Sequence, residues 1–570
     1  MILQALARYY EDLVQQGKIA KPGWSNTKVS FALCIDEKGE LQQVIPLLEE
    51  KEGKRPQPRQ MNLPAPEKRS SGIASNFLWD NSSYLLGIDA KGKPERSFQC
   101  FEACRNLHHQ LLDGIDDSEA QALLRFFDNW NPEKAEANPK LKNDYAAVVA
   151  GGNLVFRING IFANENPAIR QAWQSHYNYA EGIKRQCLVT GKYEPIEVIH
   201  PSVKGVLGAQ SSGAALVSFN APAFCSYGKE QNLNAPVGKT AAFAYTSALN
   251  YLLGVKENVQ HIGDASVVCW AEGGEEQYQT FSYAALFGQD NDSLSEGDLR
   301  DAVKKLAEGK PVQEWNLTPD RKFYILGISP NAARLSVRFF YQDTFGNLMK
   351  NVDAHQRRME IVHGPNEFAV LPLWALLRET VTLNAKDKTP NPVMAAAVAK
   401  AIFTGGLYPA ALLEQTMIRI RAEHNVTRGR AAIIKAFYLR NPNKDCPQEV
   451  LTVALNEKST NPAYTLGRLF SVYEAIQLAA NPGVNTTIKD KYFNSAASTP
   501  ATIFPLLDNL AQKHLRKLST GQRIWYENKI MEVTALLNEF PSRLSLPQQG
   551  AFDLGYYHQT QKRFEKKEEK

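Results

Sequence analysis

An amide-rich loop that leads into a helix offers the clearest candidate for chemistry in this sequence. From Gly238 onward apolar residues recur at spacings of three and four, which predicts a helix. Lys239 and Thr240 would lie in its first turn, where free backbone N–H groups and the helix dipole favour a phosphate. The alternative is that the loop amides only cap the helix and satisfy one another. The polar loop residues are Asn220, Ser226, Lys229, Gln231, Asn232 and Asn234.

The run Gly238-Lys239-Thr240 imitates the end of a nucleotide-binding P-loop. That motif needs a glycine five residues earlier, and Leu233 stands there. The tight anion nest cannot form in the usual way, so this sequence argues against ATP binding.

Catalytic motifs are missing from the sequence. It contains no GxSxG elbow, no HExxH pair and no histidine–aspartate doublet. His108 and His109, with Asp113, Asp116 and Asp117 downstream, form one weak metal constellation, for which a solvated helix end is the favoured alternative. We therefore expect a binding protein that is not an enzyme and needs no cofactor or metal.

Composition narrows the class of protein further. A chain of 570 residues with 44% hydrophobic residues predicts two or three folded domains. No apolar run is long enough to cross a bilayer, and Leu3–Gln16 reads as an amphipathic helix rather than a secretion signal. The seven cysteines lack paired-motif spacing, so we expect free thiols in a reducing cytoplasm. A net charge of +5 does not by itself prove nucleic-acid binding.

Periodicity predicts an α+β fold in which a mixed region precedes a helical one. Strands are expected at 28–35, 41–47, 154–162, 322–328 and 334–342, and helices at 98–128, 168–186 and 366–384. From Val393 the chain reads as almost wholly helical and ends in an up-down bundle. The expected domains are a mixed α/β region at 1–384, a basic helical connection at 385–450 and the bundle at 451–570.

A basic, proline-rich stretch near the N-terminus is a candidate arm for a DNA backbone. It covers residues 51–59 and continues to Lys68, Arg69, Ser70 and Ser71. Prolines at 56, 58, 64 and 66 should keep it extended and outside any central strand. A solvated surface loop is the alternative.

Two further polar segments could read base edges in a groove. The first is Phe77–Asp89, where Asn76 and Asn81 accompany aromatic residues. The second is the glycine- and serine-rich run Gly205–Gly213, with Gln210, Ser211 and Ser212 as possible donors. Each could equally close a turn.

One-sided positive charge marks the segment Met417–Lys444. Arg421, Arg428 and Lys435 are seven residues apart and would share one face of a continuous helix, although Gly429 weakens that continuity. Arg430 adds to the charge, and Lys513 and Arg516 could lie along a flank of the bundle. The pattern favours a nucleic-acid path.

Five long blocks carry a family resemblance: CLVTGKYEPIEVIHPSVKGVLGAQSSGA, SFNAPAFCSYGKEQNLNAP, NPAYTLGRLFSVYEAIQ, TTIKDKYFNSAASTPATIFPLL and GAFDLGYYHQ. They resemble the large subunit of the type I-C CRISPR Cascade, an RNA-guided surveillance complex. The resemblance covers nearly the whole chain.

The resemblance implies a non-catalytic subunit that recognises the protospacer-adjacent motif in double-stranded target DNA, while a guide CRISPR RNA reads the target by base pairing. The implied protein partners are the Cascade backbone subunits, the subunit that binds the guide-RNA handle, the small subunit and a nuclease-helicase. The C-terminal bundle resembles the small subunit and would support the displaced strand of the R-loop.

Site residues follow from matching these roles to the segments above. For motif DNA we expect Lys68, Arg69, Ser70, Ser71, Asn76, Asn81, Gln210, Ser211 and Ser212. For the displaced strand we expect Arg421, Arg428, Arg430, Lys435, Lys513 and Arg516. For the RNA handle or a subunit contact we expect Lys229, Asn232, Asn234 and Lys239.

The family resemblance also implies a separate small subunit, made from an internal start near Val453 and spanning about 453–570. Two rival functions remain: a general nucleic-acid scaffold without motif reading, and a metal-dependent nucleic-acid enzyme.

Overall fold

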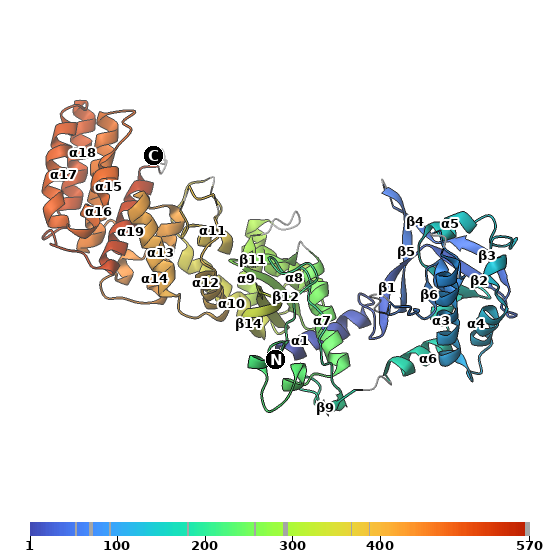
Figure 1. Ribbon diagram of the computed structural model, residues 1–570. Helices are drawn as coiled ribbons and strands as arrows, with labels where there is room; N and C mark the ends of the chain where they lie inside the picture. Colours follow the sequence, from blue (N-terminus) through green and yellow to red (C-terminus); the bar gives the residue numbers. More distant parts are fainter. Residues whose placement is uncertain are drawn as a thin grey trace. The chain divides into compact units, whose positions relative to one another are not determined.

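A computed structural model describes residues 1–51, 54–67, 72–90, 93–178, 182–255, 258–288, 295–365, 367–382, 384–386 and 388–564 (Figure 1). The chain forms two compact units, of which the first comprises 1–201 and 218–248 and the second 202–217 and 249–570. Each unit combines helices with strands, which confirms the α+β class.

In its described residues, the first unit contains helices and three β-sheets. Its main elements are α1 (Ile2–Gln15), β1 (Trp24–Val29), β2 (Phe31–Ile35), β3 (Leu41–Pro46), β4 (Leu48–Lys51), β5 (Lys54–Pro64), β6 (Trp79–Asp80), α2 (Ser82–Leu85), α3 (Pro94–Leu112), α4 (Ser118–Asn129), α5 (Tyr145–Ala150), β7 (Leu154–Ile158), β8 (Ile161–Phe162), α6 (Pro167–Asn178), β9 (Lys184–Gln186) and β10 (Tyr193–Pro195). Helix α7 (Lys239–Gly254) begins in this unit and ends in the second.

The largest sheet of the first unit has the order β3-β2-β7-β6, with β8 paired to β7. Strands β2 and β7 run parallel, with Phe31 opposite Leu154, and the other pairs are antiparallel. A parallel pair needs a long crossover, which here includes α3 and α4. Buried residues of both helices share a core with Phe156 of β7.

Strand β5 corrects the expectation that prolines exclude this stretch from a central strand. It lies between β1 and β4 in the order β1-β5-β4. Its first half pairs with β4, where Pro58 faces Leu48, and its second half pairs with β1, where Pro64 faces Trp24. Each half therefore has one neighbour, so a residue without an N–H is tolerated.

Two predicted elements of the first unit are shorter than the sequence suggested. The expected helix 98–128 is α3 and α4, because Asp117 caps α4 by accepting from the N–H groups of Glu119 and Ala120. The expected helix 168–186 ends at Asn178, and Lys184–Gln186 forms the strand β9 of a hairpin.

The second unit begins with a four-stranded sheet and continues as a stack of helices. Its main elements are β11 (Gln260–Ile262), β12 (Ala265–Ala271), α8 (Glu276–Phe287), α9 (Glu296–Ala307), β13 (Lys322–Asn331), β14 (Arg334–Thr344), α10 (Phe345–Met359), α11 (Leu373–Arg378), α12 (Pro392–Thr404), α13 (Ala410–Glu423), α14 (Arg428–Arg440), α15 (Pro462–Ala480), α16 (Ile488–Ser498), α17 (Pro500–Leu515), α18 (Thr520–Thr534) and α19 (Leu546–Lys562).

The sheet has the order β11-β12-β13-β14 and is antiparallel throughout. Every residue of β12 is buried, and α8 packs on this strand, while α10 and α12 pack on β14. The strands predicted at 322–328 and 334–342 are confirmed as β13 and β14. The helix expected at 366–384 is reduced to α11.

The last five helices of the unit lie together, with α15 packed against the other four (Figure 1). Pro500 is the first residue of α17 and Ser519 caps α18, as the sequence signals predicted. One hydrophobic core continues from Ile262 to Tyr557. The boundaries expected at 384 and 450 fall inside this unit, and the three-part division stays a prediction.

Candidate nucleic-acid interface

Asn76, which was expected to read DNA, instead forms hydrogen bonds that fix the conformation of the segment 72–80. Asn76 is 4% exposed, its Oδ1 accepts from the Glu67 N–H at 2.9 Å, and its own N–H donates to Asp80 at 3.0 Å. Asn81 caps α2 by accepting from the Ser83 N–H at 3.0 Å. The prediction that Asn76 reads a base edge is therefore wrong, because its side chain is buried. The side-chain oxygen of Asn81 is used to cap α2.

The remaining motif-DNA candidates fall into two groups. Lys68, Arg69, Ser70 and Ser71 lie outside the described residues. Gln210, Ser211 and Ser212 belong to the second unit and are exposed. Their turn is closed by the Gly213 N–H, which donates to the Gln210 oxygen at 2.9 Å. The three polar side chains are therefore presented to solvent by a tight turn, and their role stays a prediction.

His108 forms a hydrogen bond with the same segment. It is 0% exposed, its Nδ1 lies 2.8 Å from the Cys104 carbonyl oxygen, and its Nε2 accepts from the Leu78 N–H at 3.1 Å. Leu78 has a φ of 67°, a left-handed conformation that costs energy in a branched residue. Because Nδ1 must donate and Nε2 must accept, the ring is neutral, and burial lowers its pKa to about 4.

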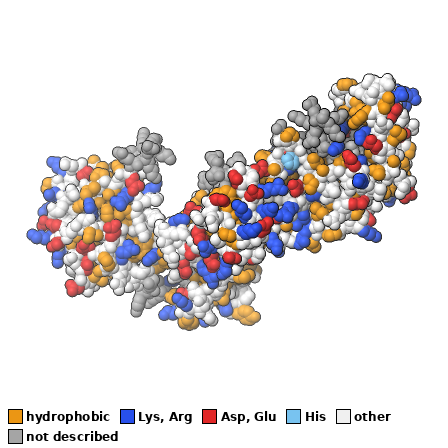
Figure 2. All heavy atoms as spheres, turned by 180° about the vertical axis from the view of Figure 1, so that it is seen from behind, with side chains coloured by type: hydrophobic (Ala, Val, Ile, Leu, Met, Phe, Trp, Pro, Cys, Tyr) orange, Lys and Arg blue, Asp and Glu red, His pale blue; other side chains and the backbone are white. Residues whose placement is uncertain are grey.

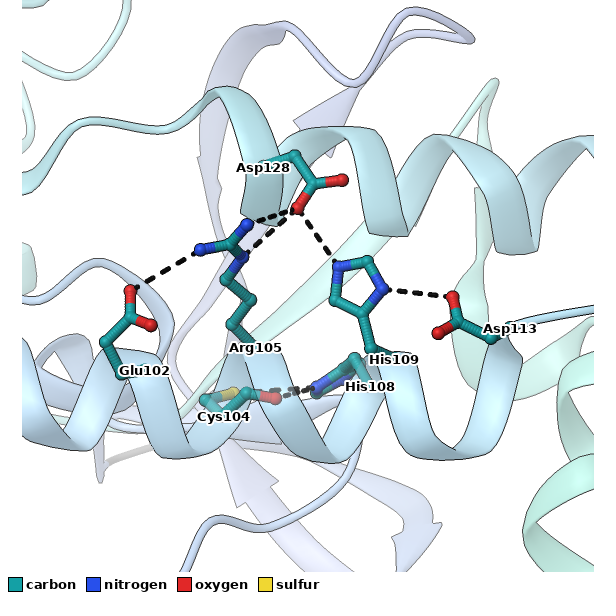
Figure 3. Close-up of polar contacts among 7 residues, drawn as sticks. All are labelled: Glu102, Cys104, Arg105, His108, His109, Asp113 and Asp128. Carbon is teal, nitrogen blue, oxygen red and sulfur yellow. Dashed lines mark hydrogen bonds and ion pairs between the residues drawn. The ribbon is translucent and has the colours of Figure 1, made fainter.

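His109 joins an ion-pair network instead of a metal site (Figure 3). It points toward Asp113 and Asp128, each 3.0 Å away, whereas His108 turns back toward Cys104. Arg105 donates to the same oxygen of Asp128, Oδ1, at 2.8 Å. Burial acts to lower the pKa of His109, but the hydrogen bonds and charges of the two aspartates raise it overall.

The solvated helix end that was favoured over a metal site fits the partly exposed His109, but not His108, which is buried. Asp117 caps α4, and both nitrogens of His108 are already bonded. Within the ranges that the structure describes, no group of three His, Cys, Asp or Glu side chains is placed to hold a metal ion. All seven cysteines are free thiols, as expected.

The loop before α7 satisfies its own amides. The Asn234 side chain accepts from the Ser226 N–H at 2.8 Å and donates to the carbonyl oxygens of Lys229 and Gln231 at 3.0 and 2.9 Å. Asn232 is 3% exposed. Asn232 is a correction as a contact residue because it is buried, whereas Asn234 is half-buried and its contact role stays a prediction. Lys229 is exposed and Lys239 is half-buried.

The expected phosphate seat at the start of α7 is occupied by the protein. Cys187 Sγ accepts from the Gly238 N–H at 3.1 Å, and from the N–H groups of Val189 and Thr190 at 3.4 Å each. The Glu194 carboxylate also lies against Gly238. A phosphate here would meet a negative neighbour, so the structure favours the alternative in which the protein itself satisfies the start of the helix. Sequence alone did not single out Cys187.

The basic stripe of 421–440 turns largely inward. Helix α13 ends at His424, whose φ is 48°, so Arg421 and Lys435 lie on different helices. Arg430 is 0% exposed and binds Glu423 and the Asn425 carbonyl oxygen. A buried cation needs such partners, because desolvation without them is costly.

Two further residues of the stripe are buried and donate to backbone oxygen atoms. Arg428 donates to the carbonyl oxygens of Phe368 and Ala369. Lys435 is 2% exposed and donates to the Arg358 oxygen at 3.0 Å, and burial lowers its pKa to about 8. The prediction that the displaced strand contacts Arg428, Arg430 and Lys435 is therefore wrong, because all three are buried.

Other cations of this group face solvent. Arg421 is exposed and donates to Gln549 Oε1 at 2.5 Å, and Lys513 and Arg516 are exposed near the end of α17. Figure 2 shows a dense group of Lys and Arg side chains on the face seen from behind, so exposed positive surface exists apart from the three inward residues.

These features define a class of protein: a helix-rich α+β chain that presents polar turns and cations to solvent and uses His108 and His109 in structural contacts. The chain belongs to the CRISPR-associated protein family Cas_Csd1, whose family model matches residues 6–564. This is the family of the type I-C Cascade large subunit, as the resemblance implied. No curated protein matches the sequence. In the described part of the chain, no helix combines the length and hydrophobicity needed to span a bilayer.

Proposed function

We propose that this chain is the non-catalytic large subunit of a type I-C Cascade that recognises the protospacer-adjacent motif in duplex DNA. The observation that carries the proposal is the match to the Cas_Csd1 family over residues 6–564. It is supported by hydrogen bonds of Asn76, Asp80 and His108, which hold the described residues that precede and follow 68–71 in the sequence.

The same proposal gives the second unit a role at the displaced strand. Lys513 and Arg516 remain as exposed cations of the bundle, and Arg421 of α13 donates to Gln549 of α19. The guide CRISPR RNA, the backbone and handle-binding subunits, a small subunit and a nuclease-helicase are the proposed partners.

The test compares two target duplexes that differ only in the flanking motif bases. The complex is assembled on its guide RNA with and without this chain, and binding is measured at one fixed salt concentration because phosphate contacts depend strongly on salt. We expect the complex to discriminate between the duplexes only when the chain is present. Equal binding to both duplexes with the chain present would favour the general scaffold.

A pair of substitutions localises the effect. Lys68→Ala with Arg69→Ala should weaken duplex binding and reduce the slope of log affinity against log salt by about 0.9 for each phosphate that these side chains neutralise. Lys93→Ala, an exposed lysine at the start of α3, is the matched control and should change neither quantity. DNA cleavage that depends on an added divalent metal would instead favour the rival enzyme.

A further inference from the structure

A groove of about 1170 Å³ opens on the C-terminal bundle. It lies among α15, α18, the end of α19 and residues 455–458. The aliphatic side chains Val472, Ala475 and Val533 are at most 5% exposed and form its floor. The floor is therefore apolar, and the polar groups of the groove belong to the other lining residues.

Positive charge dominates the lining. The cations are Lys458, Arg468, Lys529, Lys562 and Arg563, and the carboxylates are Glu457 and Glu532. Lys529 and Glu532 bind each other at 2.5 Å, so they offset one another. The net positive charge that remains complements an anionic ligand such as a phosphate backbone.

Two arginines contribute to this charge, and one of them is held in place by hydrogen bonds. Arg468 is 5% exposed and is fixed by Gln559 Oε1 at 3.2 Å and by the Glu457 carbonyl oxygen at 3.0 Å. Arg563 is half-buried, and its buried Nε has no hydrogen-bond partner in the described residues.

An aromatic ring lies beside these cations. Trp525 is 48% exposed, and its ring meets Tyr526 edge-on at 4.8 Å with an interplanar angle of 82°. Tyr526 is partly buried against the core, so it steadies the indole. Aromatic faces next to cations are the usual platform for unpaired bases.

We propose that this groove binds an unpaired DNA strand, with a base stacked on Trp525 and the backbone running past Arg563 and Lys458. The inference deepens the proposed function, because the displaced strand of an R-loop is such a strand. An apolar protein partner fits less well, since the aliphatic side chains named above are buried and the exposed lining consists mainly of the indole and charged side chains.

The first test measures the affinity of the full chain for a fluorescently labelled oligo-dT by anisotropy at one salt concentration. Trp525→Ala should weaken binding by about tenfold, the loss typical of one stacked base. Trp525→Phe should retain most of the affinity because it keeps an aromatic face. Trp374→Ala removes a comparably exposed tryptophan of α11 and should leave affinity unchanged.

The second test concerns charge and the source of the strand. Lys458→Ala and Arg563→Ala should each reduce the salt slope by about 0.7, the value for one phosphate of a single strand. An oligo-rU arm separates RNA from DNA: rU binding that depends on Trp525 while dT binding does not would overturn the assignment to DNA. If Trp525→Ala binds oligo-dT as tightly as the unaltered chain, the assignment of the groove to an unpaired strand is wrong. This holds also if the same variant fails to retain a subunit in the assembled complex, because the groove would then bind a protein.

Failure of this inference can be told from failure of the proposed function. Trp525→Ala should leave discrimination between the two motif duplexes intact. If the unaltered chain does not discriminate between the motif duplexes but Trp525→Ala weakens oligo-dT binding, the proposal of motif recognition is wrong and the groove assignment is retained. If the chain discriminates and Trp525→Ala has no effect on oligo-dT binding, only the groove assignment is wrong.

Discussion

Individual side chains in this protein take the role that their burial imposes. Arg430 carries a type of charge that suits DNA, yet it is fully buried against Glu423 and backbone oxygen atoms. Adjacent histidines diverge in the same way: His108 is a neutral brace for Leu78, and His109 is a partner of two carboxylates. Residue type sets what a group can do, and its surroundings decide which option is used.

The His109 network predicts a pH-dependent contribution to stability. Because the pKa of His109 is raised in the folded state, its stabilisation is complete below the ordinary histidine pKa and disappears as pH rises through the folded-state value. His109→Gln should lower the free energy of unfolding by about 1 kcal/mol or less at pH 6, and by less at pH 9. Calorimetric unfolding at both pH values measures this difference.

His261→Gln is the control for this prediction, because His261 is an exposed residue of β11. It should change the unfolding transition equally at both pH values. A larger loss for His109→Gln at pH 9 than at pH 6 would contradict the assigned charge of the imidazole.

At the scale of elements, two reciprocal glycines set the contact between α15 and α19. A Cβ on Gly467 would lie 2.0 Å from the Phe552 carbonyl oxygen, and one on Gly555 would lie 2.0 Å from the Tyr464 carbonyl oxygen. Neither helix can therefore accept even an alanine here without moving. Tyr464 and His558 add a hydrogen bond of 2.9 Å across the same pair of helices.

Gly467→Ala should destabilise the bundle by about 3 kcal/mol, at the upper end of the cost of overpacking, because the obstacle is backbone and cannot rotate away. Gly521→Ala is the matched control, since it lies in helix α18 with no atom within 4 Å of the added carbon. It should be neutral or slightly stabilising, because alanine favours helix. Thermal unfolding followed by circular dichroism would contradict the prediction if both variants melt alike.

At the scale of the whole molecule, the compact units differ from the segments that sequence suggested. The helices before and after residue 450 share one core, in which Gly550 of α19 packs against Ile434 and Tyr438 of α14. A separate product that begins near Val453 would lack α14 and would expose this face of α19. Such a product would need a partner to cover the exposed apolar surface.

The internal start is itself a prediction about the gene. Mass spectrometry of protein expressed from the native gene should detect a product spanning about 453–570 beside the full chain. Exchanging the Val453 codon for a valine codon that cannot start translation leaves the full chain unchanged and should abolish the product. Detection of only the full-length chain from the native gene would contradict the prediction.

Part of the fold could be anticipated because it depends on local pattern. Apolar periodicity gave α1, β13, β14 and most of the C-terminal helices, and Ser519 marked a helix start. The split of the helix expected at 98–128 also has a local cause, the Asp117 cap, but its signal was overlooked. The place of β5 between two half-length neighbours could not be anticipated, because pairing partners are distant in sequence.

By itself, the sequence determined the family, the α+β class and the absence of familiar catalytic motifs, because these depend on local pattern and on long matching blocks. Only the tertiary structure decided which polar groups face solvent. Arg428 bonds to oxygen atoms about 60 residues away, and Asn76 ties two segments that flank residues 68–71. A stripe of charge on a helix fits either a ligand or a buried partner, and long-range packing alone selects between them.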